Sequence, residues 1–188
     1  FSPMYNMKHY LFLVTLLSLF VACEKSIDPF MISSNSVGFL TDSTMIKELK
    51  TVFINDSLSK YIGGDEFTGT TNTISVYEKT SGFLLLELDP NYSLDSLSTI
   101  RTVRIMDPRF KNIDGLNTLS TFGDINSKYQ ISSIQNTLRS LIISVDEINA
   151  YFTLSKTELP EEMRYNMDSK IEPISIPEAA KIKDFYLQ

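Results

Sequence analysis

The 188-residue chain has no tryptophan, one histidine (His9) and one cysteine (Cys23). A single histidine near the start excludes Ser-His-Asp and Cys-His catalytic arrangements from the rest of the chain. It also excludes zinc or iron sites built on histidine. One cysteine cannot close an internal disulfide, so no covalent framework stabilises the fold. An enzyme of this sequence would have to use carboxylates, Ser/Lys pairs, tyrosine or a hard metal.

Basic residues are few and scattered. There are 17 Lys and Arg against 23 Asp and Glu, which gives a formal net charge of −6 at pH 7. We therefore expect no nucleic-acid partner. Hydrophobic residues make up 43% of the chain, which is enough for the core of one domain or of two small repeats that share a sheet.

The acidic pairs Asp65-Glu66, Asp146-Glu147 and Glu161-Glu162 consist of adjacent residues. Adjacent side chains point in different directions on a strand or a helix, so adjacency does not create a general acid/base pair. The Ser-Lys dipeptides do not indicate a catalytic dyad, and no Ser-x-x-Lys motif stands at the start of a predicted helix. We predict no catalytic residue, no cofactor and no enzymatic activity. A hydrolase that uses carboxylates or a Ser/Lys pair is the alternative.

An apolar run from Tyr10 to Ala22 follows Met7-Lys8. The run is shorter than the roughly 20 residues that a membrane-spanning helix requires. Its basic residue, apolar stretch and small final residue fit a signal peptide. We expect the natural start at Met7, residues 1–6 as an upstream extension, and a signal peptide over residues 1–22. A membrane anchor, a buried helix, or cleavage without lipidation are the alternatives.

The sequence Leu19-Phe-Val-Ala-Cys23 resembles the processing site of Gram-negative bacterial lipoproteins. The resemblance implies that Cys23 becomes the acylated N-terminus of the mature protein and anchors it in a membrane, with palmitate among its acyl chains. It implies a location in the cell envelope, and we expect the outer membrane. The leaflet stays open. Some Gram-negative groups send lipoproteins to the cell surface by acidic residues just after the cysteine, but here Lys25-Ser-Ile27 separates Glu24 from Asp28. Residues 23–36 are polar and lack periodicity, which predicts a flexible tether.

Hydrophobic periodicity predicts one helix followed by several strands, twice. Apolar residues at 45, 46, 49, 52 and 53 mark one face of a helix, and strand-like segments follow at 57–62, 73–78, 83–88 and 102–106. The pattern recurs with a helix near 120–129 and strand-like segments at 129–134, 141–145, 151–154 and 182–187.

This order predicts a single α+β domain over residues 37–188. Its expected architecture is a curved antiparallel sheet with helices packed on one face, in two tandem helix-β-β-β-β units at 37–109 and 113–188. A coincidence between two ordinary α+β segments is the alternative.

The two helix segments share a Ser-Thr-apolar motif, at Ser43-Thr44-Met45 and Ser120-Thr121-Phe122, each after a glycine-leucine element. This motif resembles modules of small outer-membrane assembly lipoproteins and the tandem units of β-lactamase inhibitor protein. The chain departs from those families in having no disulfide and in placing Gly123 within the second helix. The resemblance implies a binding role and assigns no functional residue.

One stretch has the spacing of calcium ligands. Asp89, Asn91, Ser93 and Asp95 stand at alternate positions, as in the first half of a calcium loop. Leu94 and Ile100 occupy the places where such a loop needs glycine and glutamate. An Asx-rich turn after a strand is the better interpretation, and no metal is expected.

The strand pattern also predicts an exposed binding face. If Ile74, Val76, Leu84 and Leu86 point at the helices, the opposite face carries Tyr77, Phe83, Leu85, Arg104 and Met106. Aromatic, aliphatic and arginine side chains together are typical of the core of a protein-binding patch. The alternative is that the 107–119 or 155–181 connection covers this face.

The sequence therefore favours a membrane-anchored envelope lipoprotein that acts as a non-catalytic binding or assembly module. Its expected partners are the membrane, through the N-terminal lipid, and an envelope protein, through the exposed sheet face. A surface lipoprotein that binds a glycan or small ligand is the first alternative, and the hydrolase is the second.

Overall fold

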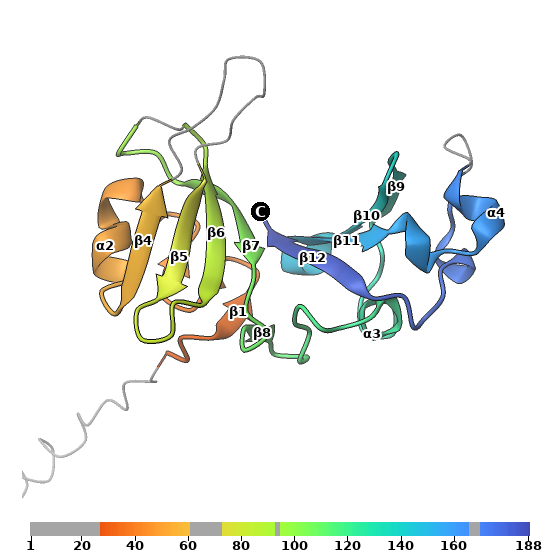
Figure 1. Cartoon of the computed structure of the whole chain (residues 1–188), viewed down its shortest axis with the longest axis horizontal. Helices are drawn as coiled ribbons and strands as arrows, with labels where there is room; N and C mark the ends of the chain where they lie inside the picture. The colour runs from red at the N-terminus through yellow and green to blue at the C-terminus, as the bar shows by residue number, and fades with distance from the viewer. Residues whose placement is uncertain (1–26, 61–72, 93–94, 166–169) are drawn as a thin grey trace, which may run out of the picture.

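The computed structural model describes residues 27–60, 73–92, 95–165 and 170–188. Its main element is an eight-stranded antiparallel sheet in the order β4-β5-β6-β7-β12-β11-β10-β9 (Figure 1). This order divides the sheet into two four-stranded meanders. The first consists of β4 (Asp56–Lys60), β5 (Ile74–Glu78), β6 (Leu84–Pro90) and β7 (Ile100–Ile105). The second consists of β9 (Ser133–Asn136), β10 (Ser140–Val145), β11 (Ala150–Ser155) and β12 (Ile182–Leu187).

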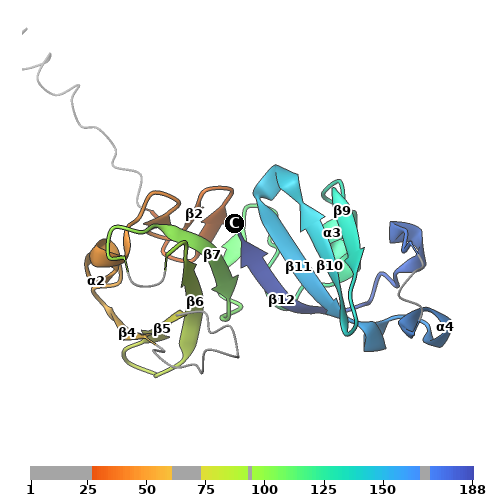
Figure 2. The same ribbon diagram turned by 90° about the horizontal axis from the view of Figure 1, so that it is seen from above.

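A short helix precedes each meander. The helix α2 (Leu49–Val52) continues the 3₁₀ turn η2 (Ile46–Glu48) before β4, and α3 (Phe122–Asn126) precedes β9. Both helices pack on the same side of the curved sheet (Figures 1 and 2). The predicted α+β class, antiparallel sheet and tandem helix-β-β-β-β order are confirmed. Both helices are shorter than their apolar patterns predict.

Alternation along the strands builds the core. In β10, for example, Leu141, Ile143 and Val145 are buried and the residues between them are half-buried. The buried side chains of the first meander meet Leu49 of α2, and those of the second meet Phe122 of α3. Each fully buried aliphatic or phenyl side chain contributes about 1.5–3 kcal/mol.

The two meanders join where β12 pairs with β7. Their register aligns Phe185 with Ile105, Tyr186 with Arg104 and Leu187 with Val103. Phe185 is fully buried, and its ring lies 4.6 Å from that of Phe152 between centroids. The last strand of the chain therefore closes the sheet through a strand more than 75 residues earlier.

A second, four-stranded sheet packs on the helix side of the first meander. Its order is β3-β2-β1-β8, with β1 (Met31–Ser33), β2 (Ser36–Val37), β3 (Leu40–Thr41) and β8 (Lys111–Asn112). Ile32 of β1 is 3% exposed and belongs to the main core. The tether expected over residues 23–36 therefore ends by Met31, because β1 pairs with β2 and, in parallel, with β8.

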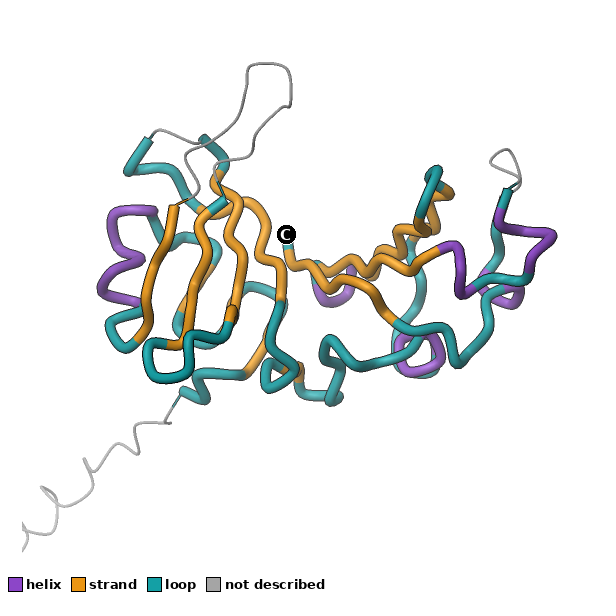
Figure 3. Tube along the Cα trace, viewed as in Figure 1, coloured by secondary structure: helices purple, strands orange, loops and turns teal. Residues whose placement is uncertain are grey.

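The described parts of the connections leave the other side of the eight-stranded sheet uncovered. The 107–119 segment runs on the side of α3, and the described part of 155–181 lies beyond the end of the second meander (Figures 1 and 3). Short helical turns occupy the described part of 155–181: η4 (Lys156–Glu158), α4 (Glu161–Arg164) and η5 (Pro173–Ser175). The turn η3 (Asp146–Ile148) connects β10 to β11 at the opposite end of the second meander. We call the side of the sheet away from α2 and α3 the open face.

Truncation of Phe185 should test the importance of the junction. Phe185→Ala should lower the free energy of unfolding by about 3–5 kcal/mol, because removing the phenyl group leaves a cavity between the two meanders. Urea denaturation followed by circular dichroism measures this loss. Tyr165→Ala, at a side chain that is 82% exposed, is the control and should change stability by less than about 0.5 kcal/mol. Equal losses in both variants would contradict a critical junction.

Candidate functional site: the open sheet face

A row of register partners crosses all eight strands on the open face. Each residue stands opposite the next on the neighbouring strand, so their side chains form one line across the sheet. From β4 to β9 the row is Ser59, Ser75, Glu87, Arg104, Tyr186, Tyr151, Ser144 and Ser133. Small hydroxyl side chains occupy both ends, and the charged and aromatic side chains occupy the centre.

Two carboxylates hold Arg104 at the centre of the row. Its guanidinium donates to Glu87 at 2.8 Å on one side and to Asp184 at 2.5 Å on the other. Asp184 also accepts from the Thr153 hydroxyl at 2.5 Å. Burial lowers the pKa of Arg104, but the hydrogen bonds to Asp184 and Glu87 outweigh this effect and raise it. Arg104 therefore joins the two meanders as a fixed cation.

An aromatic stack continues the row beside Arg104. The guanidinium carbon of Arg104 lies over the Tyr186 ring, 5.8 Å from its centroid. On the other side of Tyr186, the ring of Tyr151 lies parallel within 8°, with centroids 4.6 Å apart. Burial is the main cause that raises the pKa of both phenols, so both stay neutral and can donate hydrogen bonds at neutral pH.

The expected position of Leu85 on the open face is wrong. A bulge shifts the register of β5 and β6, so that Val76 faces Leu86 and Tyr77 faces Leu84. Leu85 falls at the extra position, is 5% exposed and packs in the main core. Leu84 takes its place beside Tyr77. Strand alternation alone assigns these leucines to the wrong sides, because one inserted residue inverts the pattern.

Phe83 and Met106, which the strand pattern places on one face, lie close together. With Leu84 and Arg109 they line a shallow hollow at one end of β6 and β7, and Tyr77 stands beside it, opposite Leu84. Phe83 is 66% exposed. This hollow is the apolar end of the open face, separate from the Arg104 centre.

Arg109 anchors this hollow to the rest of the fold. Its guanidinium donates to Asp107 at 2.9 Å and to Glu78 at 2.7 Å, and lies 4.6 Å from the centroid of Phe30. The hydrogen bonds from the Arg109 side chain lower the pKa of Asp107. The cluster links the β5–β6 hairpin to the chain just before β1.

The central residues Tyr151, Asp184 and Tyr186 were not predicted as site residues. All three stand at outward positions of strands that the sequence does predict. The missing information was the partner of the last strand: only its pairing with β7 places them beside Arg104.

The described residues of the calcium-like stretch each have a separate partner. Asp89 accepts from Thr73, the Asn91 amide donates to Thr99 at 2.9 Å, and Asp95 accepts from its own turn at the Leu97 N–H. Ser93 lies outside the described residues. Across residues 27–60, 73–92, 95–165 and 170–188, no three His, Cys, Asp or Glu side chains gather in a way that could hold a metal. The Asx-turn interpretation fits Asp95.

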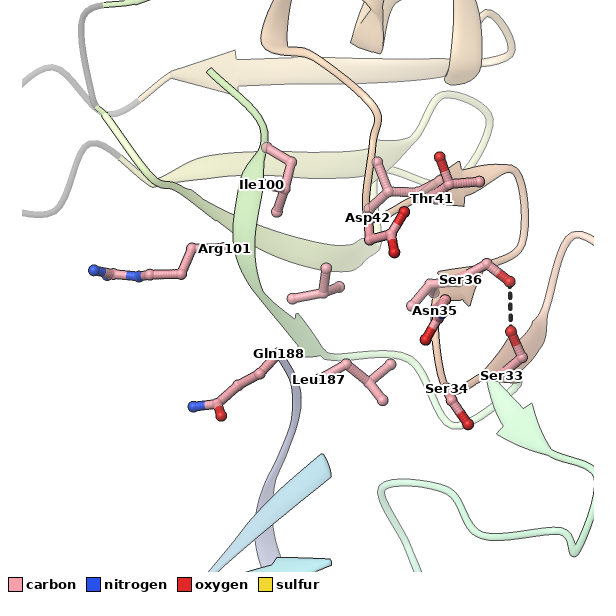
Figure 4. Close-up of a pocket in the computed structure, with 13 residues that line it drawn as sticks. Ser33, Ser34, Asn35, Ser36, Thr41, Asp42, Ile100, Arg101, Leu187 and Gln188 are labelled. Atoms are coloured by element: carbon pink, nitrogen blue, oxygen red, sulfur yellow. Dashed lines mark hydrogen bonds between the residues drawn. The ribbon is translucent and has the colours of Figure 1, made fainter. Parts of the chain in front are cut away.

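A small hollow lies where the strand ends β7 and β12 meet the β1–β3 sheet (Figure 4). Val37, Leu40 and Leu187 contribute apolar lining, and the serines of the β1–β2 turn form one rim. The hydroxyls of Ser33 and Ser36 lie 2.7 Å apart in hydrogen-bond contact. Figure 4 shows the Arg101 and Gln188 side chains extending together on the side away from these serines.

A wider groove lies where the described chain begins. Ile27, Met31, Ile113 and Ile148 contribute apolar surface to it. Tyr129 stands among its polar residues, where its hydroxyl donates to Asp114 and accepts from Asn112. Burial and the contact with Asp114 raise the pKa of Tyr129 to about 12.

Comparison with known proteins adds a fold relationship. No protein-family model matches the chain, and no curated protein matches it. Among solved structures, the uncharacterized protein yfeY from Escherichia coli is similar, with a TM-score of 0.55 and 15% sequence identity. The similarity covers 84% of this chain and 99% of yfeY. At this identity the likeness concerns the fold alone.

The Arg109 cluster predicts a stability change with pH. The folded-state pKa of Asp107 is lowered, so its stabilisation is present above the ordinary aspartate pKa and is lost as the pH falls through the depressed value. The free energy of unfolding should therefore decrease from pH 7 to pH 3, and Arg109→Met should make this decrease smaller. Urea titrations at both pH values measure it. Arg139→Met, at an exposed turn residue, is the control, and a decrease unchanged by Arg109→Met would contradict the assignment.

Proposed function

We propose that the protein is a lipid-anchored envelope lipoprotein that binds another protein through its open face and catalyses no reaction. The observation that supports the binding role is the composition of the cross-strand row: two stacked tyrosines stand between Arg104 and Ser144, with serines at both ends of the row, on a face without a covering helix in the described structure. Tyrosine offers large, rigid contact area at low entropy cost, and serine offers adaptable hydrogen bonds. Such a surface suits protein recognition.

The charges of the open face also favour binding over catalysis. Glu87 and Asp184 are the carboxylates nearest the centre of the row, and both are engaged by Arg104. A general acid or base needs a proton that it can exchange at working pH. Both carboxylates are occupied by their hydrogen bonds to Arg104, so this pair supports the geometry of the face instead.

The anchoring part of the proposal rests on the sequence around Cys23. That residue lies outside the described range, four positions before Ile27, which borders the groove beside β1. In the described part of the chain, no helix is both long and apolar enough to cross a membrane. A short acylated segment would hold this side of the domain near the bilayer.

Removal of the acylation site tests the anchor. Cys23→Ser should move the protein from the membrane fraction to the soluble fraction after cell lysis, because no acyl chain can be attached. The measurement is immunoblotting of both fractions, with metabolic labelling by a palmitate analogue. Ser26→Ala is the matched control and should stay labelled and membrane-bound. A Cys23→Ser protein that still sediments with membranes would reject the lipoprotein assignment.

A small-ligand function is the second candidate. The observation that favours it is the small hollow where β7 and β12 meet the β1–β3 sheet (Figure 4). Its apolar lining and serine rim could hold a small amphipathic molecule or part of a glycan. The open face is broader, crosses eight strands, and includes the tyrosine stack. For that reason we place protein binding first.

A bulky substitution on the open face tests the binding role. Ser75→Arg/Ser144→Arg should reduce capture of an envelope partner at least about tenfold, because two long charged side chains obstruct the centre of an interface. The measurement is crosslinking in intact cells, followed by affinity purification from solubilised membranes and quantitative mass spectrometry. Ser96→Arg/Ser127→Arg, at exposed positions off the open face, is the control. Identical partner profiles for all proteins would reject open-face binding.

A further inference from the structure

The cross-strand stack ends at Tyr151, whose ring has an aromatic neighbour on one side and a serine on the other. Its order is Arg104, Tyr186, Tyr151 and then Ser144. The two rings are parallel, and their centroids are 4.6 Å apart, close to the spacing of about 4.8 Å between neighbouring strands. The stacking direction therefore runs across the strands, and each ring has one side facing the next residue of the row.

The residues beyond Tyr151 are too small to occupy that side. Ser144 is the register partner of Tyr151, and Ser133 is the partner of Ser144 on the edge strand β9. A serine side chain ends at one oxygen and cannot cover a phenol ring, whereas on the other side Tyr186 carries both Tyr151 and the Arg104 guanidinium. We call the surface over Ser144 and Ser133, beside the ring of Tyr151, the shelf.

The shelf has the shape of one further layer in the stack. A planar group laid across Ser144 would face Tyr151 at the distance of one strand, and the two serine hydroxyls would lie beneath it to accept hydrogen bonds. No described connection covers this part of the sheet in either ribbon view (Figures 1 and 2). The planar group must therefore come from outside the described fold.

The surrounding charge selects a cation. The negative charges of Asp89 and Asp184 raise the pKa of both tyrosines, and that of Glu87 raises the pKa of Tyr186. The positive charges of Arg101 and Arg104 lower the pKa of Tyr151 and Tyr186, respectively. Arg104 is already matched by Glu87 and Asp184. One negative charge remains in excess around the stack, and the chain as a whole has a net charge of −6.

We propose that the shelf binds an arginine side chain of the protein partner, placed over the ring of Tyr151 as the Arg104 guanidinium lies over the ring of Tyr186. Arginine is planar, stacks on aromatic faces and has donors for the serine hydroxyls, whereas lysine lacks the planar group. The proposal rests on the open face being the contact surface, and it specifies the chemistry of the partner there: a basic segment that presents arginine.

A peptide titration tests the proposal without the natural partner. The probe is an acetylated, amidated Gly-Arg-Gly peptide, added to the ¹⁵N-labelled full chain in detergent micelles and followed by NMR. The expected result is saturable shifts of the amide signals of Tyr151, Ser144 and Ser133. The corresponding citrulline peptide has the same shape without the charge, and should bind about tenfold more weakly.

Two leucine variants make the test specific for the shelf. Ser144→Leu fills the shelf and should weaken peptide binding at least about tenfold. Ser127→Leu is the control, because Ser127 is exposed and lies off the open face, and it should bind within about twofold of the wild type. Ser144 points away from the core, and amide spectra verify the fold of both variants.

The proposal would be overturned by the absence of saturable shifts, by shifts away from β9–β11, or by equal weakening in Ser144→Leu and Ser127→Leu. Equal binding of Gly-Phe-Gly would also overturn it, since the shelf would then select planarity without charge. The outcome is separate from that of the membrane crosslinking. Peptide binding with unchanged partner profiles supports the shelf and rejects the envelope partner, whereas lost partners without peptide binding retain the binding function and reject the arginine.

Discussion

The pairing of β7 with β12 is the constraint on which the rest of the molecule depends. Three register pairs bring together the last strands of the two meanders, and they order side chains on both sides of the sheet at once. On the inner side they bury Phe185 against Phe152. On the open face they place Tyr186 beside Arg104. Without this pairing, two small meanders would each have an unpaired edge at the middle of the present sheet.

Alternation along the strands gives the two sides of the sheet different kinds of side chain. The inner side carries large aliphatic and phenyl groups, which pack densely against two short helices and a small second sheet. On the open face, the alternate positions of β10 and β11 carry serine, threonine and tyrosine, with Ile142 as the one large aliphatic residue among them. Small outward residues also leave the tyrosine pair standing above its neighbours, and this relief creates the shelf.

Local pattern was enough to predict most elements, and long-range pairing was not. The segments 141–145, 151–154 and 182–187 coincide closely with β10, β11 and β12, because each alternates cleanly and ends at a turn. Residues 31–33 lacked periodicity because β1 is too short to show any, and its parallel partner β8 is about 80 residues away. Leu85 was misplaced because a bulge is invisible to a period of two. The last strand's partner, which assembles the open face, has no local signal at all.

The predicted role of Arg104 changes once its neighbours are known. As an isolated outward arginine it suggested a contact residue, since arginine is enriched at the centres of interfaces. In the structure, two carboxylates already satisfy its charge, and Tyr186 covers one side of its guanidinium. A partner that took over these carboxylates would leave a half-buried cation unpaired, which costs more free energy than a new ion pair on the surface returns. Arg104 is therefore better understood as the residue that orients Tyr186 and Asp184. In the proposed complex, the contacts would come from groups of the row that Arg104 does not engage, among them the ring of Tyr151 and the serines beyond it.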